Sequence, residues 1–421
     1  MLVQTLKKTL ILIIVSFLFI STNSPTAHLR DFGSEFYTVG YLSKNNRTYD
    51  IYANFNASNN YKGNFYKFTQ SFFNTKMSDW NCPFYYMPVA SLIFNPFAYL
   101  SFSTAFMIWM GINLTILLFC LFLISKLNSE STFPWLNYLT IILLFLPILD
   151  NLFIGQVSFL FGILPLLSGF YLWLKDKNYK SALVWSLLIF KPQYLFVPAF
   201  IYTIDFLNSK QKLLVIKTTM VCLISSVIII TLNFMIFNSQ VCNAWLDCLK
   251  SSIAYDISYS IFKNYHLLTS LFFSLIIEAH ILKINYSFVN IIYALILAIL
   301  AVINFIAFKN FDLNTRVNKA LVFTTACLSL ALFSIKFFYY DFSILIFTYI
   351  ILLSLKNDAK GSLDYTEILK FIMITLAIIN IYIVFNIFTP RITVPIKLIV
   401  PYGILYLLFL KQIQKFKLTS R

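Results

Sequence analysis

An acidic residue near the start of this sequence stands where a catalytic base could act beside a membrane. Asp31, in the stretch Arg30-Asp31-Phe32, follows shortly after the first hydrophobic segment of the chain. A carboxylate at the water face of a membrane lies next to apolar surface, where desolvation can raise its pKa and tune it as a base. We therefore expect Asp31 to be the catalytic residue, and the rest of the chain to be a helical scaffold that holds it against a lipid-borne substrate.

Further polar features interrupt the hydrophobic sequence downstream of Asp31. Each also has an ordinary explanation: a glutamine can cap a helix, a lysine beside a helix-breaking proline can snorkel, and an aspartate is favourable at a helix start. The functional hypothesis depends on their meeting Asp31 on the outer side of a membrane, as the topology below predicts. The features are Gly155-Gln156, Lys191-Pro192-Gln193, His266 with Asn264, and the stretch from Lys336 to Tyr340-Asp341.

Composition places the chain among integral membrane proteins. Of its 421 residues, 59% are hydrophobic and 11% charged, and the mean hydropathy is +0.79, which is more apolar surface than a soluble core can bury. Long runs of Leu, Ile and Phe predict an all-α polytopic fold. The net charge of +16 does not require a nucleic-acid partner, because the basic residues fall mostly in short connections, where they orient the spans.

We expect a single integral-membrane domain over residues 1–421, with about 11 to 12 spans. Lys7 and Lys8 precede the first hydrophobic segment and keep the N-terminus in the cytoplasm. That segment also fits a cleavable signal peptide, and we favour a retained helix. The expected parts are a first helix at residues 9–22, an outer loop with interfacial helices at 23–102, a transmembrane bundle at 103–411 and a basic cytoplasmic tail at 412–421.

Helix breakers and basic clusters set the predicted path of the chain. Trp135–Leu149 and Leu152–Leu174 predict a hairpin of two spans that turns at Asp150-Asn151. Ser181–Phe190 and Tyr194–Phe206 are both short, so we expect two helices that meet at the Pro192 break and keep the flanking lysine clusters on the cytoplasmic side. A second outer loop is expected at Asn238–Tyr265 and a re-entrant segment at Asn264–Leu282.

Cysteines and histidines give little sign of a metal or a disulfide framework. Cys82, Cys242 and Cys248 fall in expected loops, where a disulfide is possible and unsupported. The sequence holds three histidines, no His-x-x-x-His pattern and no clustered Asp-x-Asp pair. We therefore expect neither a metal nor another cofactor, and the absence of a soluble nucleotide-binding domain disfavours nucleotide sugars as donors.

Taken in order, these motifs resemble those of glycosyltransferase family 87, membrane enzymes of the GT-C superfamily that were formerly grouped as a domain of unknown function. The likeness extends from about residue 10 to 410. The Gly-Gln motif here continues as Gly-Gln-Val-Ser, where an Asn often stands in the last place. The motifs are Arg30-Asp31-Phe32, Tyr85-Tyr86-Met87-Pro88, Gly155-Gln156, Lys191-Pro192-Gln193 and Tyr339-Tyr340-Asp341-Phe342.

The resemblance implies a hexosyltransferase-like enzyme of the plasma (inner) membrane. It would move a hexose or pentose, with a mannose-like sugar expected, from a polyprenyl-phosphate donor to a lipid-linked or glycan acceptor at the extracytoplasmic face, with inversion. On this pattern Asp31 takes the place of the general base, and Lys191 neutralises the phosphate leaving group. Gln156, Gln193 and His266 would contact sugar or phosphate, and Arg30, Tyr340 and Asp341 complete the expected substrate-binding set.

Two other classes of protein stay open from the residues alone. A transporter or flippase of a lipid-linked sugar also uses broken helices, although the two halves of this chain show no evident repeat. A lipid-linked glycan ligase or polymerase also has many spans, but such enzymes usually carry a large late loop with several arginines. The sequence does not name the sugar, the acceptor or the linkage, since a shared fold does not select among them.

Overall fold

The computed structural model describes residues 2–20, 31–53, 64–73, 84–128, 134–262, 270–283, 285–334, 338–359, 363–388 and 396–419. These residues are nearly all helical, and no β-strand occurs among them. The N-terminal part comprises α1 (Leu2–Ile20), the π-helix η3 (Phe32–Tyr37), α2 (Thr38–Lys44), α3 (Thr48–Tyr52), α4 (Asn64–Phe73), α5 (Pro88–Phe94) and η5 (Asn95–Tyr99).

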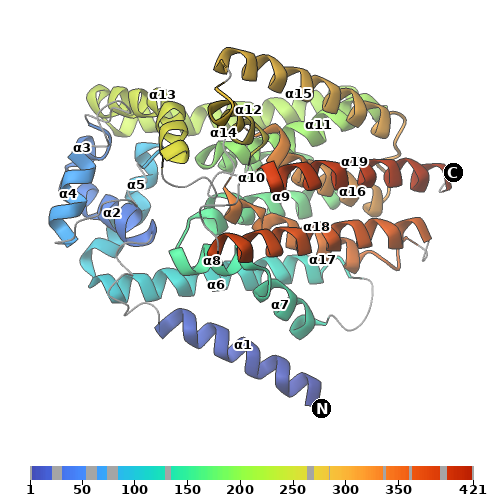
Figure 1. Ribbon diagram of the computed structural model, residues 1–421, viewed down its shortest axis with the longest axis horizontal. Coiled ribbons are helices and arrows are strands. Elements are labelled where there is room, and N and C mark those ends of the chain that lie inside the picture. Colours follow the sequence, from blue (N-terminus) through green and yellow to red (C-terminus); the bar gives the residue numbers. More distant parts are fainter. Residues whose placement is uncertain are drawn as a thin grey trace.

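The remaining helices form a bundle in which α16, α17, α18 and α19 lie side by side (Figure 1). The bundle comprises α6 (Phe102–Ser125), α7 (Trp135–Leu143), α8 (Leu146–Ile154), η6 (Phe159–Ile163), α9 (Leu164–Leu174), α10 (Asn178–Ser186), η7 (Leu187–Phe190), η8 (Pro192–Leu195), α11 (Phe196–Asn208), α12 (Lys212–Ile236), α13 (Ser239–Phe262), α14 (Leu271–Ile281), α15 (Tyr286–Phe308), α16 (Arg316–Phe333), η9 (Tyr339–Phe342), α17 (Ser343–Ser354), α18 (Leu363–Phe388) and α19 (Ile396–Thr419).

Several of these helices are built to cross a membrane, so the chain is an all-α polytopic membrane protein. Within the described residues, five helices are long and apolar enough, namely α6, α12, α15, α16 and α18, or six with the bent pair α7–α8. The apolar window of α16 is 78% buried and that of α12 only 22%, so α16 lies inside the bundle while α12 faces outward. The count of 11 to 12 spans, which included shorter segments, stays a prediction.

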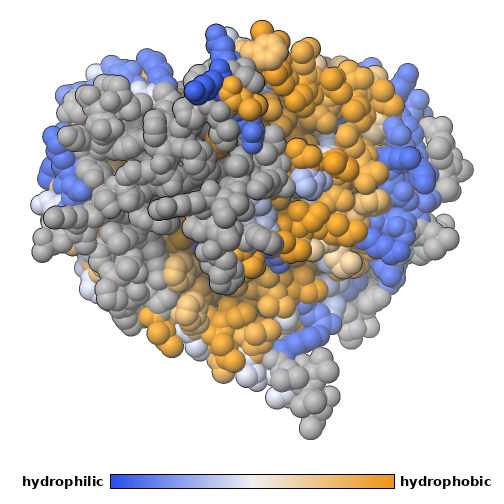
Figure 2. Space-filling view, viewed as in Figure 1, coloured by the Kyte–Doolittle hydropathy of each residue, from blue (hydrophilic) through white to orange (hydrophobic). Residues whose placement is uncertain are grey.

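The outward-facing helices expose a continuous apolar surface. Figure 2 shows this surface across the view, bordered by hydrophilic residues at the edge where α19 ends. Large side chains of α12 and α15 contribute to it, including Leu223, Val227, Ile291 and Ile299, each more than half exposed. Such side chains would be unfavourable in water over so large an area, and they are the expected surface of a helix that faces lipid.

The expected hairpin at Asp150-Asn151 is wrong, because both residues lie inside α8. The chain breaks earlier, where α7 and α8 meet at an angle of 73°. Pro147 in the first turn of α8 lacks an N–H and its ring excludes the carbonyl four residues back, so one helix cannot run through. The helix α8 then ends at Gly155, whose φ of 72° lies in the left-handed region.

Replacing Gly155 by alanine is expected to destabilise the fold. A Cβ at this position would lie 2.6 Å from Cβ of Phe32 and 2.8 Å from a ring carbon of Phe106. The left-handed backbone alone costs a non-glycine residue about 1–2 kcal/mol. Thermal unfolding of the detergent-solubilised protein measures the effect. Gly111→Ala is the matched control, since nothing lies within 4 Å of its added Cβ and alanine favours a helix. Equal unfolding temperatures for the two variants would contradict the expected crowding.

The break at Pro192 is confirmed. Between η7 and η8 the backbone of Lys191 leaves the helical region, with φ of −133° and ψ of 74°. The helix α10 therefore runs toward the break, and α11 returns from it. Asn178 at the start of α10 lines the same cavity as Lys210 beyond α11. The lysine clusters that flank this pair lie at the same end of the molecule, as expected.

Contacts between the other basic segments occur at this same end. The Lys319 ammonium lies 2.6 Å from Asp176, and Arg316 donates a hydrogen bond of 2.6 Å to the carbonyl of Leu127. Lys417 donates to the carbonyl of Lys309. We call this region the basic end. Which side of the membrane it faces stays a prediction from the positive-inside rule.

The segments expected to be the second outer loop and the basic tail are helical. The second outer loop is the 24-residue helix α13, which contains neither Gly nor Pro and carries an Asp247–Lys250 ion pair of 3.1 Å. The expected tail contains the end of α19, which continues to Thr419, and its position in the cytoplasm stays a prediction. Cys242 and Cys248 are buried, and Cys82 lies outside the described residues.

The stretch between α1 and α6 contains short helices, as expected for residues 23–102. In Figure 1 the helices α2 to α5 gather at one end of the bundle beside α13. Aromatic rings hold them together, with the Phe36 and Phe94 ring centroids 5.0 Å apart. That these helices lie on a membrane surface stays a prediction.

Candidate functional site

Asp31 is positioned by the aromatic residue that follows it. Asp31 immediately precedes η3, all of whose residues are buried, while its own side chain is partly exposed. The fully buried ring of Phe32 stacks on Phe106 and Trp109, with centroid distances of 5.3 and 5.8 Å. This stack fixes the start of η3 against α6 and so fixes the position of the carboxylate.

Gln156 holds the Asp31 carboxylate from the opposite side. Its Nε2 donates hydrogen bonds to Oδ2 of Asp31 at 2.6 Å and to the Tyr340 hydroxyl at 3.1 Å. Its Oε1 accepts from the backbone N–H of Val157 at 2.8 Å and from the Tyr86 hydroxyl at 3.4 Å. Because the backbone N–H requires an oxygen, the amide cannot flip, and its NH2 group must face Asp31.

Lys191 lies in the same cluster and pairs with Asp341. Its Nζ is 2.5 Å from Oδ1 of Asp341 and also donates to the Ser158 hydroxyl. The Tyr194 hydroxyl donates to the same Asp341 oxygen at 3.2 Å. The two charged residues are 3% and 0% exposed, so the pair is desolvated and tightly held.

Asp341 occupies the first turn of η9, as expected for a helix start. Its Oδ2 accepts from the backbone N–H of Phe338 at 3.1 Å. Nδ2 of Asn151 donates to the Tyr340 carbonyl at 3.0 Å and to the Ser343 hydroxyl at 2.9 Å, which fastens η9 to α8. Through these bonds α8 positions both Gln156 and Tyr340.

Partial burial raises the pKa of Asp31 toward neutral pH. Desolvation raises the pKa of Asp31 from 3.8 to about 6, while the hydrogen bond from Gln156 and the charge of Lys191 oppose the rise. The buried Glu35, four residues after Asp31, is close enough for its negative charge to act on Lys191 as well. The result is a carboxylate that is mostly ionised at neutral pH and can take up a proton near it.

The structure brings together Asp31, Gln156, Lys191, Tyr340 and Asp341, which we call the Asp31 cluster. Gln193 sits half-buried in η8, and within the described part of the chain no hydrogen bond joins it to the cluster. Arg30, His266, Asn264 and Lys336 lie outside the described residues.

Several members of the network were not expected from the sequence. Ser158 ends the Gly-Gln-Val-Ser motif, and Tyr194 follows Lys191 by three residues, so both stood next to recognised motifs. Glu35 follows Asp31 at i+4, the spacing that places two side chains on one helix face. Tyr86 lies in the Tyr85-Tyr86-Met87-Pro88 motif and Asn151 in the expected turn at Asp150-Asn151, but neither was expected to contact the site.

Within the described ranges, no three His, Cys, Asp or Glu side chains group closely enough to hold a metal ion. That the enzyme needs no metal stays a prediction. What the cluster does contain is a proton acceptor, Asp31, and a cation, Lys191, which act on each other electrostatically and are linked through Gln156 and Tyr340. This pairing suits transfer of a group from a phosphate leaving group to a hydroxyl.

Fold and site together define a polytopic helical membrane protein with an acid–base and cation cluster suited to group transfer. The model of glycosyltransferase family 87 matches residues 84–334, more than half of the chain, and the chain belongs to that family. The protein is therefore a membrane glycosyltransferase. No curated protein and no solved structure matches the chain. The matched residues include Gln156 and Lys191, whereas Asp31, Tyr340 and Asp341 fall outside them, so their assignment depends on geometry.

Proposed function

We propose that this glycosyltransferase moves a sugar, mannose-like or a pentose, from a polyprenyl-phosphate donor to a lipid-linked or glycan acceptor. The reaction takes place at the extracytoplasmic face of the plasma membrane and inverts the anomeric configuration. The observation that carries the proposal is the Asp31 cluster itself. Gln156 binds Asp31 and Tyr340 through one amide nitrogen, and Lys191 lies 5.1 Å from the Tyr340 ring centre.

In the proposed reaction Asp31 is the general base. The acceptor hydroxyl gives its proton to the carboxylate, and its oxygen forms a bond to the anomeric carbon as the bond from that carbon to the phosphate oxygen breaks. The polyprenyl phosphate leaves with the electron pair and one more negative charge than it had in the donor. A base on one face of the sugar and a cation on the other are what inversion requires.

Lys191 supplies the positive charge for the leaving phosphate. An ammonium has three N–H donors, and hydrogen bonds to Asp341 and Ser158 use two of them, which leaves one for a phosphate oxygen. Because three carboxylates act on this one lysine, a second cation would favour phosphate binding. Arg30, which directly precedes Asp31 in the sequence, would supply it.

The direct test supplies membranes that contain the wild-type protein or Asp31→Asn with a panel of labelled polyprenyl-phosphate sugars. Label in lipid or glycan acceptors from one donor, lost in the variant, would identify the sugar and support the base. Product that survives in the variant would assign the base to another residue. No product from any donor would favour a flippase, and a flipping assay with the same lipids would then decide.

The pH profile should report on the Asp31–Gln156 bond. In the wild type, kcat/KM should fall on the acid side with a midpoint near pH 6, because protonated Asp31 cannot act as a base. The Gln156 bond lowers the pKa of Asp31, so Gln156→Leu should move the midpoint to higher pH. Gln193→Leu is the matched control, and its acid limb should stay in place. An unchanged acid limb in Gln156→Leu would mean that the pH dependence does not arise from Asp31.

A further inference from the structure

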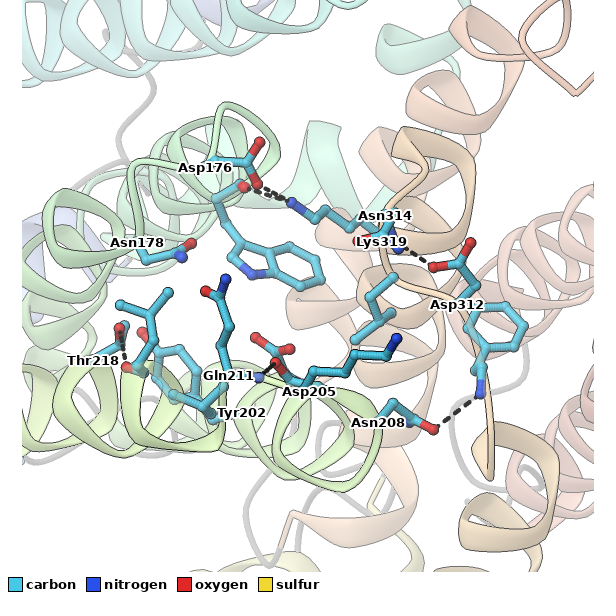
Figure 3. A pocket seen from close by; sticks show the side chains of 17 residues that line it. Asp176, Asn178, Tyr202, Asp205, Asn208, Gln211, Thr218, Asp312, Asn314 and Lys319 are labelled. Carbon is cyan, nitrogen blue, oxygen red and sulfur yellow. Dashed lines mark hydrogen bonds and ion pairs between the residues drawn. The ribbon is translucent and has the colours of Figure 1, made fainter.

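A second polar cavity lies at the basic end, away from the Asp31 cluster. Its volume is about 460 Å³, within the range of small-ligand sites. The turn after α9, the end of α11, the start of α12 and the segment 311–314 enclose it (Figure 3). The helical stretch from Ser158 to Trp173 separates the two sites by roughly 22 Å at helical rise.

Buried oxygen atoms line this cavity without hydrogen-bond partners. The Tyr202 hydroxyl and Oδ1 of Asn178 are both buried and unpaired within the described structure, and Tyr202 is only 6% exposed. An unmet buried polar group costs about 1–3 kcal/mol, so such atoms commonly face a ligand or water. Figure 3 shows the Asp205 carboxylate and the Gln211 amide directed into the same space, and among the described residues neither side chain has a hydrogen bond to protein.

The unpaired groups are both donors and acceptors. Asp205 and Oδ1 of Asn178 accept hydrogen bonds, Nε2 of Gln211 donates, and the Tyr202 hydroxyl does either. A ligand that matches them must accept and donate at closely spaced positions, as the hydroxyl groups of a sugar do. An ammonium ligand could only donate, so it would not use the N–H groups of the exposed Gln211 side chain.

The charges at the cavity disfavour an anion. Asp176, Asp205 and Asp312 line it together with two lysines, Lys210 and Lys319. The Lys319 ammonium is already bound to Asp176 at 2.6 Å and to the Trp173 carbonyl at 3.2 Å. A phosphate would therefore meet more negative than available positive charge, whereas a neutral polyhydroxylated molecule meets no such penalty.

We propose that this cavity binds a neutral sugar, with Asp205, Tyr202, Asn178 and Gln211 hydrogen-bonding its hydroxyl groups. The sugar comes either free from water or as the head group of a glycolipid in the adjoining leaflet. Binding here is independent of the reaction at the Asp31 cluster, so the two can be tested apart.

The test uses the full chain in phosphatidylcholine nanodiscs. Free monosaccharides are titrated while thermal unfolding and tryptophan fluorescence are followed, since Trp173 lines the cavity. At least one sugar should bind saturably and with stereochemical preference. Asp205→Asn and Tyr202→Phe should each weaken that binding at least tenfold, whereas Asp247→Asn, at an exposed ion pair on α13, and Asp31→Asn should bind as the wild type does.

A second arm separates the two sources. Nanodiscs that contain a monoglycosyl diacylglycerol should raise the unfolding temperature if the ligand is a glycolipid head group, again dependent on Asp205 and Tyr202. Stabilisation that is equal for all sugars and all variants would be exclusion of sugar from the surface and would overturn the proposal. No effect of sugar in either form would overturn it too, as would saturable stabilisation by ethanolamine but by no sugar. Tyr202→Phe removes only one oxygen atom, so it still tests the proposal if the Asp205→Asn variant misfolds.

Discussion

Asp31→Asn is expected to abolish sugar transfer and to raise the temperature at which the protein unfolds. The asparagine keeps the shape of the side chain and can still accept the bond from Gln156, but it cannot take a proton from the acceptor hydroxyl. Loss of a general base costs typically 10²–10⁴-fold in rate. Transfer by the variant should therefore fall by at least about 100-fold.

The gain in stability follows from the raised pKa of Asp31. A folded-state pKa of about 6 against an ordinary value of 3.8 means that the folded protein binds this proton more tightly than the unfolded chain does. The stabilising contribution is therefore complete below about pH 4 and is lost as the pH rises through about 6. At neutral pH the partly buried carboxylate costs on the order of 3 kcal/mol by this linkage, and a neutral asparagine removes much of that cost.

The measurement is thermal unfolding of both proteins at pH 7.5 and at pH 4.5, together with the transfer assay. The advantage of the variant should be present at the higher pH and should shrink at the lower one. Asp50→Asn is the matched control, because Asp50 forms a partly exposed ion pair with Arg47 at 2.8 Å. Its loss should leave transfer intact and lower stability by at most about 1 kcal/mol. An Asp31→Asn protein that unfolds earlier than wild type would show that the carboxylate serves structure.

The parts of the fold that could be predicted from sequence are those that follow from local chemistry. Apolar length predicts membrane-spanning helices such as α6 and α12, because an uninterrupted run of that length has no other way to satisfy its backbone in a membrane. The break at Pro192 is predictable for a similarly local reason. The predicted hairpin at Asp150-Asn151 was wrong because stronger helix breakers stand on either side of this polar pair. Pro147 and Gly155 set where the chain bends, although Asp150-Asn151 would also be favourable in a loop.

The Asp31 cluster was predictable in its members but not in its bonds. Asp31 stands out because it follows the first hydrophobic segment, and Gln156 and Lys191 stand out because a polar residue beside a helix breaker is rare in an apolar sequence. That Lys191 pairs with Asp341, 150 residues later, depends on how α8 and η9 pack, and no local pattern contains that information. The same applies to the 460 Å³ cavity, whose lining comes from helix ends and connections that are far apart in the sequence.

A variant that lacks Lys191 alone is expected to lose activity for a reason that cannot be assigned to catalysis or to stability, and a double variant separates the two. Lys191→Met leaves the fully buried Asp341 without its cation, which costs about 3–5 kcal/mol and removes activity through instability alone.

The double variant Lys191→Met, Asp341→Asn takes away both charges, so its stability should return to within about 1 kcal/mol of wild type. If Lys191 stabilises the leaving phosphate, the double variant should fold normally and still lose at least about 100-fold in kcat/KM for the donor, the usual cost of removing such a group. Unfolding temperatures and donor titrations for the wild type, both single variants and the double variant close the cycle. Lys370→Met, at an exposed ion pair with Glu367 on α18, serves as the control for loss of a surface cation. Wild-type transfer by a stable double variant would mean that Lys191 and Asp341 only fasten η9 to the break at Pro192. Another cation would then have to neutralise the leaving phosphate. Arg30 would be the first residue to replace in the search for it.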